Sequence, residues 1–318
     1  MKNTKIYAKI LQFSFWKMLF TLLGVLAMIV LPMIAGALTY KNMSVFAVAV
    51  IAALIAGIVI NFLLSRYASY MLTCGQIAMI ERGLTTGEMP KDVFKAGKEA
   101  VKERFATANV YFVLKGITSS ITHEITSVVN KLTDSKNDAV STVTGLISLG
   151  IAVILEYVNY CSLAWVFHKK EQNAFKSTCD GAVIYFQNWK TLLANVGKIL
   201  GITVVSLIVL CIPLIVGSVV LFVAVEPLAV FCEAVDAVFE LELGTVAMMA
   251  SLVIGIMLWI GLHGAFVKPY IMVSVMRGYI AAGEANPPKV DIYGKLSDMS
   301  KSFKKALGKA QESGEVMA

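Results

Sequence analysis

The chain has 318 residues, of which 58% are hydrophobic and only 15% are charged, and its formal net charge is +7. A soluble globular domain has about 45–50% apolar and about 25% charged residues, so this composition excludes an ordinary soluble protein. The apolar residues also lie in long uncharged blocks instead of the amphipathic stripes of a soluble core, and this pattern predicts an all-α integral membrane protein.

The N-terminal part of the chain predicts two transmembrane helices, at about residues 18–38 and 44–65. Neither block contains an acidic or basic side chain, and each is long enough to supply the roughly 20 residues that cross a bilayer core of about 30 Å. A basic segment precedes the first block, and no small-residue cleavage site separates the two blocks. We therefore expect the first helix to be retained and not removed as a signal peptide.

The middle of the chain predicts a second pair of spans, at about residues 107–129 and 140–167. The later block is interrupted only by Glu156, whereas the earlier one is too polar for hydropathy alone to detect. Short cytoplasmic loops are rich in Lys and Arg, and the segments 66–115 and 168–198 are both basic. Both can be cytoplasmic only if an even number of crossings lies between them, so the polar block is also predicted to cross.

The last third of the chain predicts spans at about residues 199–225 and 243–267, followed by a basic amphipathic helix at 289–312. In that final helix, apolar residues recur at three- and four-residue spacing between lysines. This pattern is typical of a cytoplasmic helix that lies in the membrane interface and is attracted to anionic lipid headgroups. With six spans both termini are cytoplasmic. The acidic segment 226–242, which has no Lys or Arg, then lies outside.

Matched motifs flank the first and third pairs of spans and appear in the same order in both pairs. They are Trp16-Lys17, Arg82-Gly83, Gly87-Glu88 and Pro90-Lys91 in the first pair, and Trp189-Lys190, Arg277-Gly278, Gly283-Glu284 and Pro287-Pro288-Lys289 in the third. Pro32 and Pro213 occupy matching places in spans one and five, where a proline frees a carbonyl and kinks a helix. We therefore predict a six-helix transmembrane bundle built from three similar helical hairpins with cytoplasmic interfacial amphipathic helices.

The motif after span two consists of Arg82-Gly83, then Gly87-Glu88-Met89-Pro90, and then a short basic helix. It resembles that of a loose group of uncharacterised prokaryotic multi-span membrane proteins. Their membrane region is also found fused to glycerophosphodiester phosphodiesterases, but this chain has no phosphodiesterase domain. The resemblance covers most of the chain in layout and only a short motif in sequence. It implies a helical bundle in the bacterial plasma membrane and implies no activity.

The third span carries polar residues on one helical face, and the fourth adds a carboxylate and an amide one turn apart. Together they form a candidate intramembrane polar site: Lys115, Ser119, Thr122, His123, Glu124, Glu156 and Asn159. Ionisable groups inside a membrane usually face a bundle interior or a water-filled cavity, which favours a solute pathway. The alternative is that these side chains make interhelical hydrogen bonds. For His263, in span six, we expect a hydrogen-bonded packing role.

No enzyme motif is found, so we predict neither a catalytic residue nor a cofactor. The string from His123 to Ser127 begins like HExxH but has Ser at the second zinc-ligand position, and the five cysteines show no metal-site spacing. Nucleic-acid binding is not expected, because no soluble domain remains to present the positive charge. Two functions remain open. One is a transporter or permease-like protein for a small solute or lipid, and the other is a non-transporting scaffold or accessory subunit.

Overall fold

The computed structural model describes residues 1–64, 69–104, 157–188 and 196–312, and every regular element in these ranges is helical. The helices are α1 (Asn3–Thr39), α2 (Met43–Leu63), α3 (Ser69–Thr85), α4 (Val93–Arg104), α7 (Ala174–Gln187), α9 (Val196–Ser206), η2 (Leu207–Cys211), α10 (Ile212–Ala224), α11 (Glu226–Val238), α12 (Thr245–Leu262), η3 (His263–Val267), α13 (Lys268–Ala285), α14 (Val290–Met299) and α15 (Lys301–Glu312). Residues 157–168 are also helical and are called helix 157–168 below. The predicted all-α class is thus found throughout the described residues.

Among the described residues, four helices are long and apolar enough to cross a membrane: Asn3–Thr39, Met43–Leu63, Ile199–Ala224 and Thr245–Ala285. They overlap the predicted spans one, two, five and six. The last of them continues through η3 and α13, well beyond the predicted end of span six. Residues 107–129 and most of 140–167 lie outside the described residues, and with them the predicted third span and most of the fourth.

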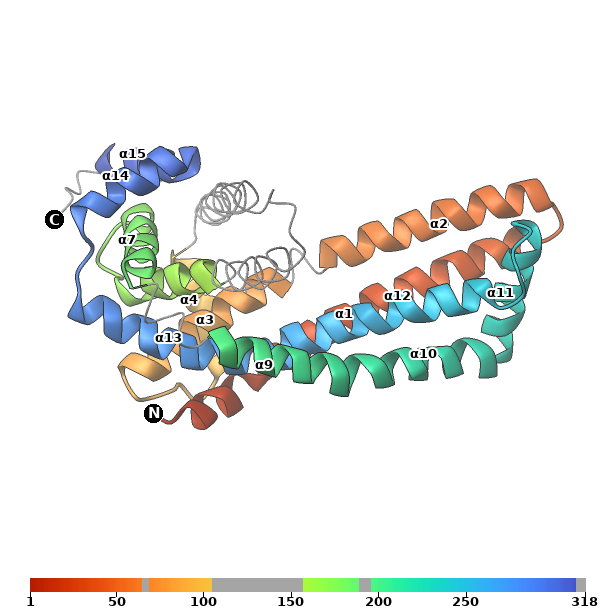
Figure 1. Cartoon of the computed structure of the whole chain (residues 1–318), viewed down its shortest axis with the longest axis horizontal. Helices are drawn as coiled ribbons and strands as arrows, with labels where there is room; N and C mark the ends of the chain where they lie inside the picture. The colour runs from red at the N-terminus through yellow and green to blue at the C-terminus, as the bar shows by residue number, and fades with distance from the viewer. Residues whose placement is uncertain (65–68, 105–156, 189–195, 313–318) are drawn as a thin grey trace, which may run out of the picture. The chain divides into compact units, whose positions relative to one another are not determined.

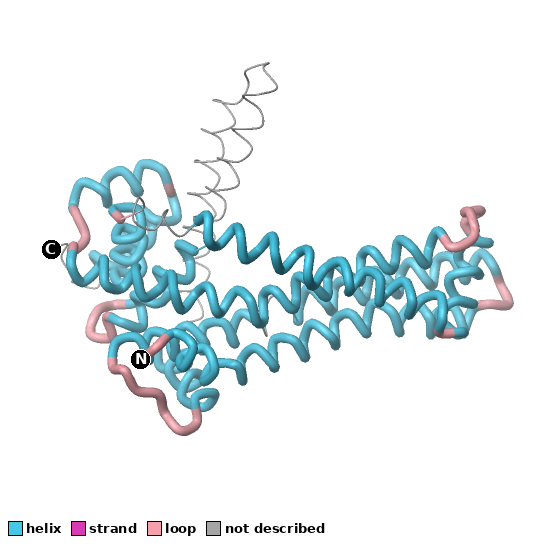
Figure 2. The backbone as a smooth tube through the Cα atoms, turned by 60° about the horizontal axis from the view of Figure 1, so that its bottom comes forward, coloured by secondary structure: helices cyan, strands magenta, loops and turns pink. Residues whose placement is uncertain are grey.

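The chain divides into two compact units, each assembled from distant parts of the sequence. Unit 1 consists of Met1–Ile10, Cys74–Gly201 and Tyr270–Ala318, and unit 2 consists of Leu11–Thr73 and Ile202–Pro269. Unit 2 holds most of the apolar helix length. Its parts of α1, α2, α10 and α12 run alongside one another, with α11 at one end (Figures 1 and 2).

Small residues bring α12 close to α10 in unit 2. Ala247, Ser251 and Gly255 recur every four residues on α12 and are all buried, and we call them the α12 seam. A Cβ atom added to Gly255 would lie 2.7 Å from the Cα of Ile215 on α10. Lipid tails are as apolar as the helices, so helices in a membrane associate through this kind of close packing and not through the hydrophobic effect.

In unit 1 the C-terminal segment packs against α7. The sequence predicts one helix over 289–312, but the structure has two, α14 and α15, separated at Ser300. The backbone of Ser300 is extended, and its hydroxyl accepts a hydrogen bond from the Phe303 amide at 3.1 Å, so that it caps α15. Of the apolar residues predicted to face lipid, Leu296 and Phe303 are buried within the protein, Ile292 and Leu307 are half-buried, and Met299 is exposed. Part of that face is therefore occupied by protein contacts.

Arg104, the last residue of α4, holds the end of helix 157–168 in unit 1. Its guanidinium donates to the backbone carbonyls of Val166 at 2.9 Å, Lys169 at 2.6 Å and Gln172 at 2.7 Å. The final carbonyls of a helix have no partner within the helix, and a cation at that end also complements the helix dipole. One side chain therefore both terminates helix 157–168 and fixes the loop to α7.

The seam gives a direct test of the α10–α12 contact. Gly255→Ala should lower the stability of the purified protein by about 1–3 kcal/mol, the usual cost of overpacking a tight contact. Gly217→Ala is the matched control, because a Cβ at that position on α10 meets no atom within 4 Å. Thermal unfolding in detergent measures both variants. Equal melting temperatures for the two would contradict the close approach at Gly255.

Candidate functional site

The described part of unit 2 contains a partly open cavity of about 500 Å³, which we call the apolar cavity. It is lined by residues of α1, α2, α10, α11 and α12 and by Leu241, which follows α11. Met28, Pro32, Val50, Phe231, Met249 and Val253 are among the lining residues, and none of the side chains in the wall carries a charge. Pockets for small molecules usually measure about 300–1,000 Å³. The apolar cavity therefore has the size of a ligand site but offers almost no hydrogen-bonding groups.

Helix α11 supplies the wall of the cavity at one end of unit 2. Its buried residues Leu228, Cys232 and Val235 face the cavity, whereas Glu233 is exposed. Burial, together with the nearby charges of Asp236 and Glu233, raises the pKa of the Cys232 thiol to about 11. Carboxylate charge therefore lies close to the apolar wall at this end.

Asp236 attaches α11 to the beginning of α12. One oxygen of its buried carboxylate accepts the Gly244 amide at 2.8 Å, and the other accepts the Val246 amide at 3.0 Å. The first amides of a helix have no partner within the helix, and a negative charge there is favoured by the helix dipole. Gly244 has a φ of +85°, a left-handed conformation that glycine adopts without strain. The cavity wall contributed by α11 is thus fixed in place.

His263 lies at the start of η3, and its Nδ1 is 2.8 Å from the hydroxyl of Ser206, at the end of α9. The Trp259 indole donates to the Ser206 carbonyl at 3.2 Å. The prediction that His263 is a hydrogen-bonded residue is confirmed. Ser206 also directly precedes the π-helical turn η2, so that the irregular turns η2 and η3 are joined by this hydrogen bond.

Unit 1 contains a cluster of three polar side chains, Glu81, His168 and Glu284, which we call the carboxylate–histidine cluster. Nδ1 of His168 is 3.0 Å from an oxygen of Glu81, and its Nε2 is 3.4 Å from an oxygen of Glu284. The Thr85 hydroxyl donates to the same Glu81 oxygen at 3.1 Å. The Glu81 side chain is only 7% exposed, whereas that of Glu284 is 56% exposed. Each ring nitrogen of His168 therefore faces a carboxylate oxygen.

The cluster ties together the ends of three helices, because Glu81 lies on α3, His168 ends helix 157–168 and Glu284 lies on α13. Within the described ranges no group of three or more His, Cys, Asp or Glu side chains could hold a metal ion.

The predicted polar site falls almost entirely outside the described residues, since Lys115, Ser119, Thr122, His123, Glu124 and Glu156 belong to residues 105–156. Asn159 is described and lies half-buried in helix 157–168. Of the two prolines, Pro32 lies inside α1 and lines the apolar cavity. Pro213 is the second residue of α10, two positions after the end of η2.

Sequence reasoning missed both the cavity and the cluster. Glu81 and His168 are 87 positions apart, a distance over which composition and periodicity predict no contact. One local signal was present, because Glu81 adjoins the Arg82-Gly83 motif and Glu284 belongs to the Gly283-Glu284 motif of the repeated pattern.

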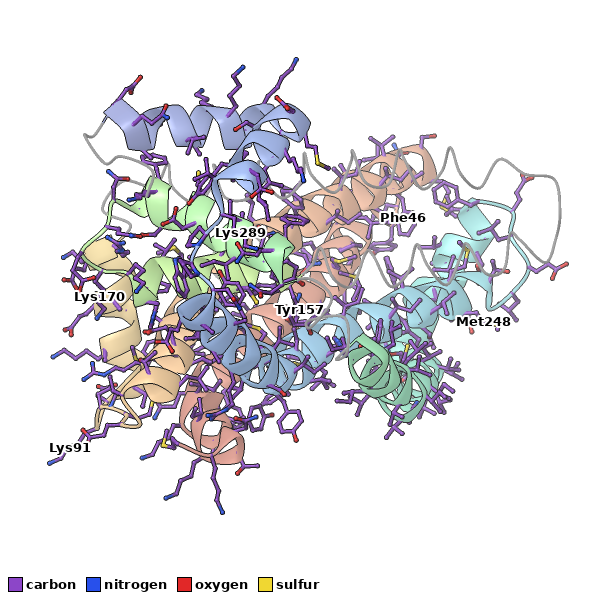
Figure 3. The ribbon with its side chains drawn as sticks, turned by 60° about the vertical axis from the view of Figure 1, so that its left-hand side comes forward. Phe46, Lys91, Tyr157, Lys170, Met248 and Lys289 are labelled. Carbon is purple, nitrogen blue, oxygen red and sulfur yellow. The ribbon has the colours of Figure 1, made fainter. Side chains whose placement is uncertain are left out.

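His168→Leu should destabilise unit 1 by about 1–3 kcal/mol, since it leaves the buried Glu81 carboxylate without its main donor. Adding Glu81→Leu should restore part of the loss, because removing both partners of a buried polar pair is close to neutral. Lys170→Leu, at an exposed position two residues from His168 (Figure 3), serves as the control. Thermal unfolding of wild type and of the three variants gives the stabilities to be compared. A double variant less stable than His168→Leu would show that Glu81 depends on other partners.

No protein-family model, no curated protein and no solved structure matches this chain. Function is therefore inferred from the cavity and the cluster themselves.

Proposed function

We propose that the protein is a permease-like integral membrane protein that binds and moves a lipid or another apolar solute. The observation that carries this proposal is the apolar cavity, whose wall combines parts of the membrane-compatible helices with α11. A polar solute entering it would lose its hydrogen bonds to water and gain almost none, at a cost of several kcal/mol. An apolar chain has no such bonds to lose, so the lining selects against polar solutes.

Two of the helices around the cavity also contain irregular turns, and such turns allow a helix to change its direction. η2 and η3 are π-helical turns in two of the membrane-compatible helices, and such turns occur frequently at functional sites. Pro213 lies two positions after η2, and the Ser206–His263 hydrogen bond joins the two turns. These features support a rearrangement of the helix that includes α9, η2 and α10.

A non-transporting membrane scaffold is the second candidate, and a different surface favours it. Exposed lysines lie on and beside α4, α14 and α15: Lys91, Lys95, Lys98, Lys102, Lys289, Lys295, Lys301, Lys304 and Lys305. Lys91 and Lys289 are labelled in Figure 3. The lysines would bind anionic lipid headgroups by charge, and salt would weaken that binding. With these surfaces on the cytoplasmic side, both termini would be cytoplasmic, in a bacterial plasma membrane.

Filling the cavity tests the favoured function. The full chain in nanodiscs of a zwitterionic lipid should bind Nile red, an uncharged apolar fluorophore, and Ala250→Phe should weaken that binding by roughly tenfold or more, because the new ring occupies the site. Met248→Phe is the control, since Met248 is 70% exposed on α12 and is not part of the cavity wall. Fluorescence titration measures all three proteins. Equal binding by both variants and wild type would contradict a ligand site in the cavity and leave the scaffold as the better account.

A further inference from the structure

The length of the apolar cavity follows from where its lining begins and ends on two helices. On α2 the lining runs from Val50 to Ile58, and on α12 it runs from Val246 to Ile254. The residues of each pair are eight positions apart in the sequence, which at about 1.5 Å per helical residue gives a length of about 12 Å. Because α2 and α12 run alongside each other (Figures 1 and 2), both helices measure the same direction of the cavity.

Helix α11 closes the cavity at the end where both of these runs begin. Val50 of α2 and Val235 of α11 belong to one buried cluster, and Val246 of α12 packs against that cluster. Leu228 and Phe231 of α11 are also part of the wall. The lined part of the cavity therefore ends at α11 and extends about 12 Å from it along the helices.

The volume of the cavity is too large for a single extended chain of that length. An apolar cavity of about 150 Å³ holds benzene, which has six carbons, so a cavity of about 500 Å³ has room for about 20 carbons. An extended hydrocarbon chain advances about 1.25 Å per carbon, given bonds of about 1.52 Å and angles near 111°, so that about ten carbons span about 12 Å. The cavity thus has the length of one ten-carbon chain and the volume of two.

The wall suits flexible chains better than a rigid ring system. Met28, Met33 and Met249 contribute unbranched side chains, which adjust to fill irregular gaps. Empty space in a packed interior is destabilising, so a ligand that fills the full width of the cavity is favoured over one that fills half of it. Because the cavity is partly open and no side chain in its wall carries a charge, a polar headgroup stays outside.

Resting on the proposed apolar-ligand function, we infer that the ligand is a two-chain lipid and that the cavity takes about ten carbons of each chain, side by side. A single-chain amphiphile would fill only half of the width and leave the rest of the cavity empty. Two-chain lipids form the bilayer, so the ligand enters the cavity from the membrane and not from water.

Two lipids with the same headgroup and the same number of chain carbons test the inference. One is a phosphatidylcholine with two ten-carbon chains, and the other is a lysophosphatidylcholine with one twenty-carbon chain. Each is used to displace Nile red from the full chain purified in a maltoside detergent. The two-chain lipid should displace the dye at roughly tenfold lower concentration, because it fills volume that the single chain leaves empty. The Ala250→Phe variant, whose cavity is filled, gives the partition of the dye and of each lipid into the micelle alone, which is subtracted.

A narrower cavity assigns the preference to the site. Ala250 lies halfway along the α12 lining, and Ala250→Leu should remove most of the preference for the two-chain lipid while the single chain still displaces the dye. Met248→Leu is the matched control, because Met248 is exposed and is not part of the cavity wall. This variant should keep the preference of wild type.

Equal displacement by the two lipids would overturn the inference, as would a preference that survives in Ala250→Leu. Stronger displacement by a sterol, whose fused rings are broad and rigid, would overturn the choice of paired chains. In each of these cases Nile red would still bind wild type, so the proposed apolar-ligand function would stand. Failure of Nile red to bind wild type, in micelles and in nanodiscs alike, would instead reject that function.

Discussion

The close approach of α10 and α12 along the α12 seam sets the geometry on which the rest of unit 2 depends. Ala247, Ser251 and Gly255 occupy one face of α12, and only small side chains allow the two backbones to come together there. Larger apolar residues of the same helix, among them Val246, Met249 and Val253, line the cavity. One face of α12 thus makes a close contact with α10, whereas another face lines the cavity.

The path of the segment that connects α10 to α12 follows from the same contact. With these helices adjacent, the segment between them must turn back within a short distance, and α11 fills that turn with its apolar face toward the cavity. Asp236 stabilises the arrangement, because its buried carboxylate finds two backbone amides that would otherwise lack partners. The cost of burying this charge is offset by the bonds it makes, and the same placement leaves the other acids of the segment at the surface.

Unit 1 depends on polar side chains that join segments far apart in the sequence. The Tyr293 hydroxyl of α14 donates to the buried Asp180 carboxylate of α7, and burial, followed by the charge of Asp180, raises the pKa of Tyr293 well above its ordinary value. Tyr293 therefore remains a neutral donor at any physiological pH. Arg104 and the carboxylate–histidine cluster act in the same way, each satisfying groups that the helices cannot satisfy themselves.

The amino-acid sequence predicts the apolar helices well, because a long uncharged block has few alternatives to a membrane helix. It says less about where a helix ends. The helix that includes predicted span six runs on to Ala285, since hydropathy detects the apolar part of a helix and not the continuation of its backbone hydrogen bonds. The final helix was expected to be single, and the extended backbone at Ser300 divides it. The cavity was not predicted, because it depends on which faces of five helices meet. The periodicity of apolar residues along each helix does not determine which faces these are. The polar site proposed on spans three and four remains a prediction.

A density map of the full chain in lipid nanodiscs, obtained without added ligand, would show whether the cavity holds an apolar chain. We expect an elongated density in the cavity bounded by Pro32, Phe231 and Met249, with its end beside α11. Side chains that meet across this space, or a chain of ordered waters within it, would contradict the claim that the cavity holds an apolar chain.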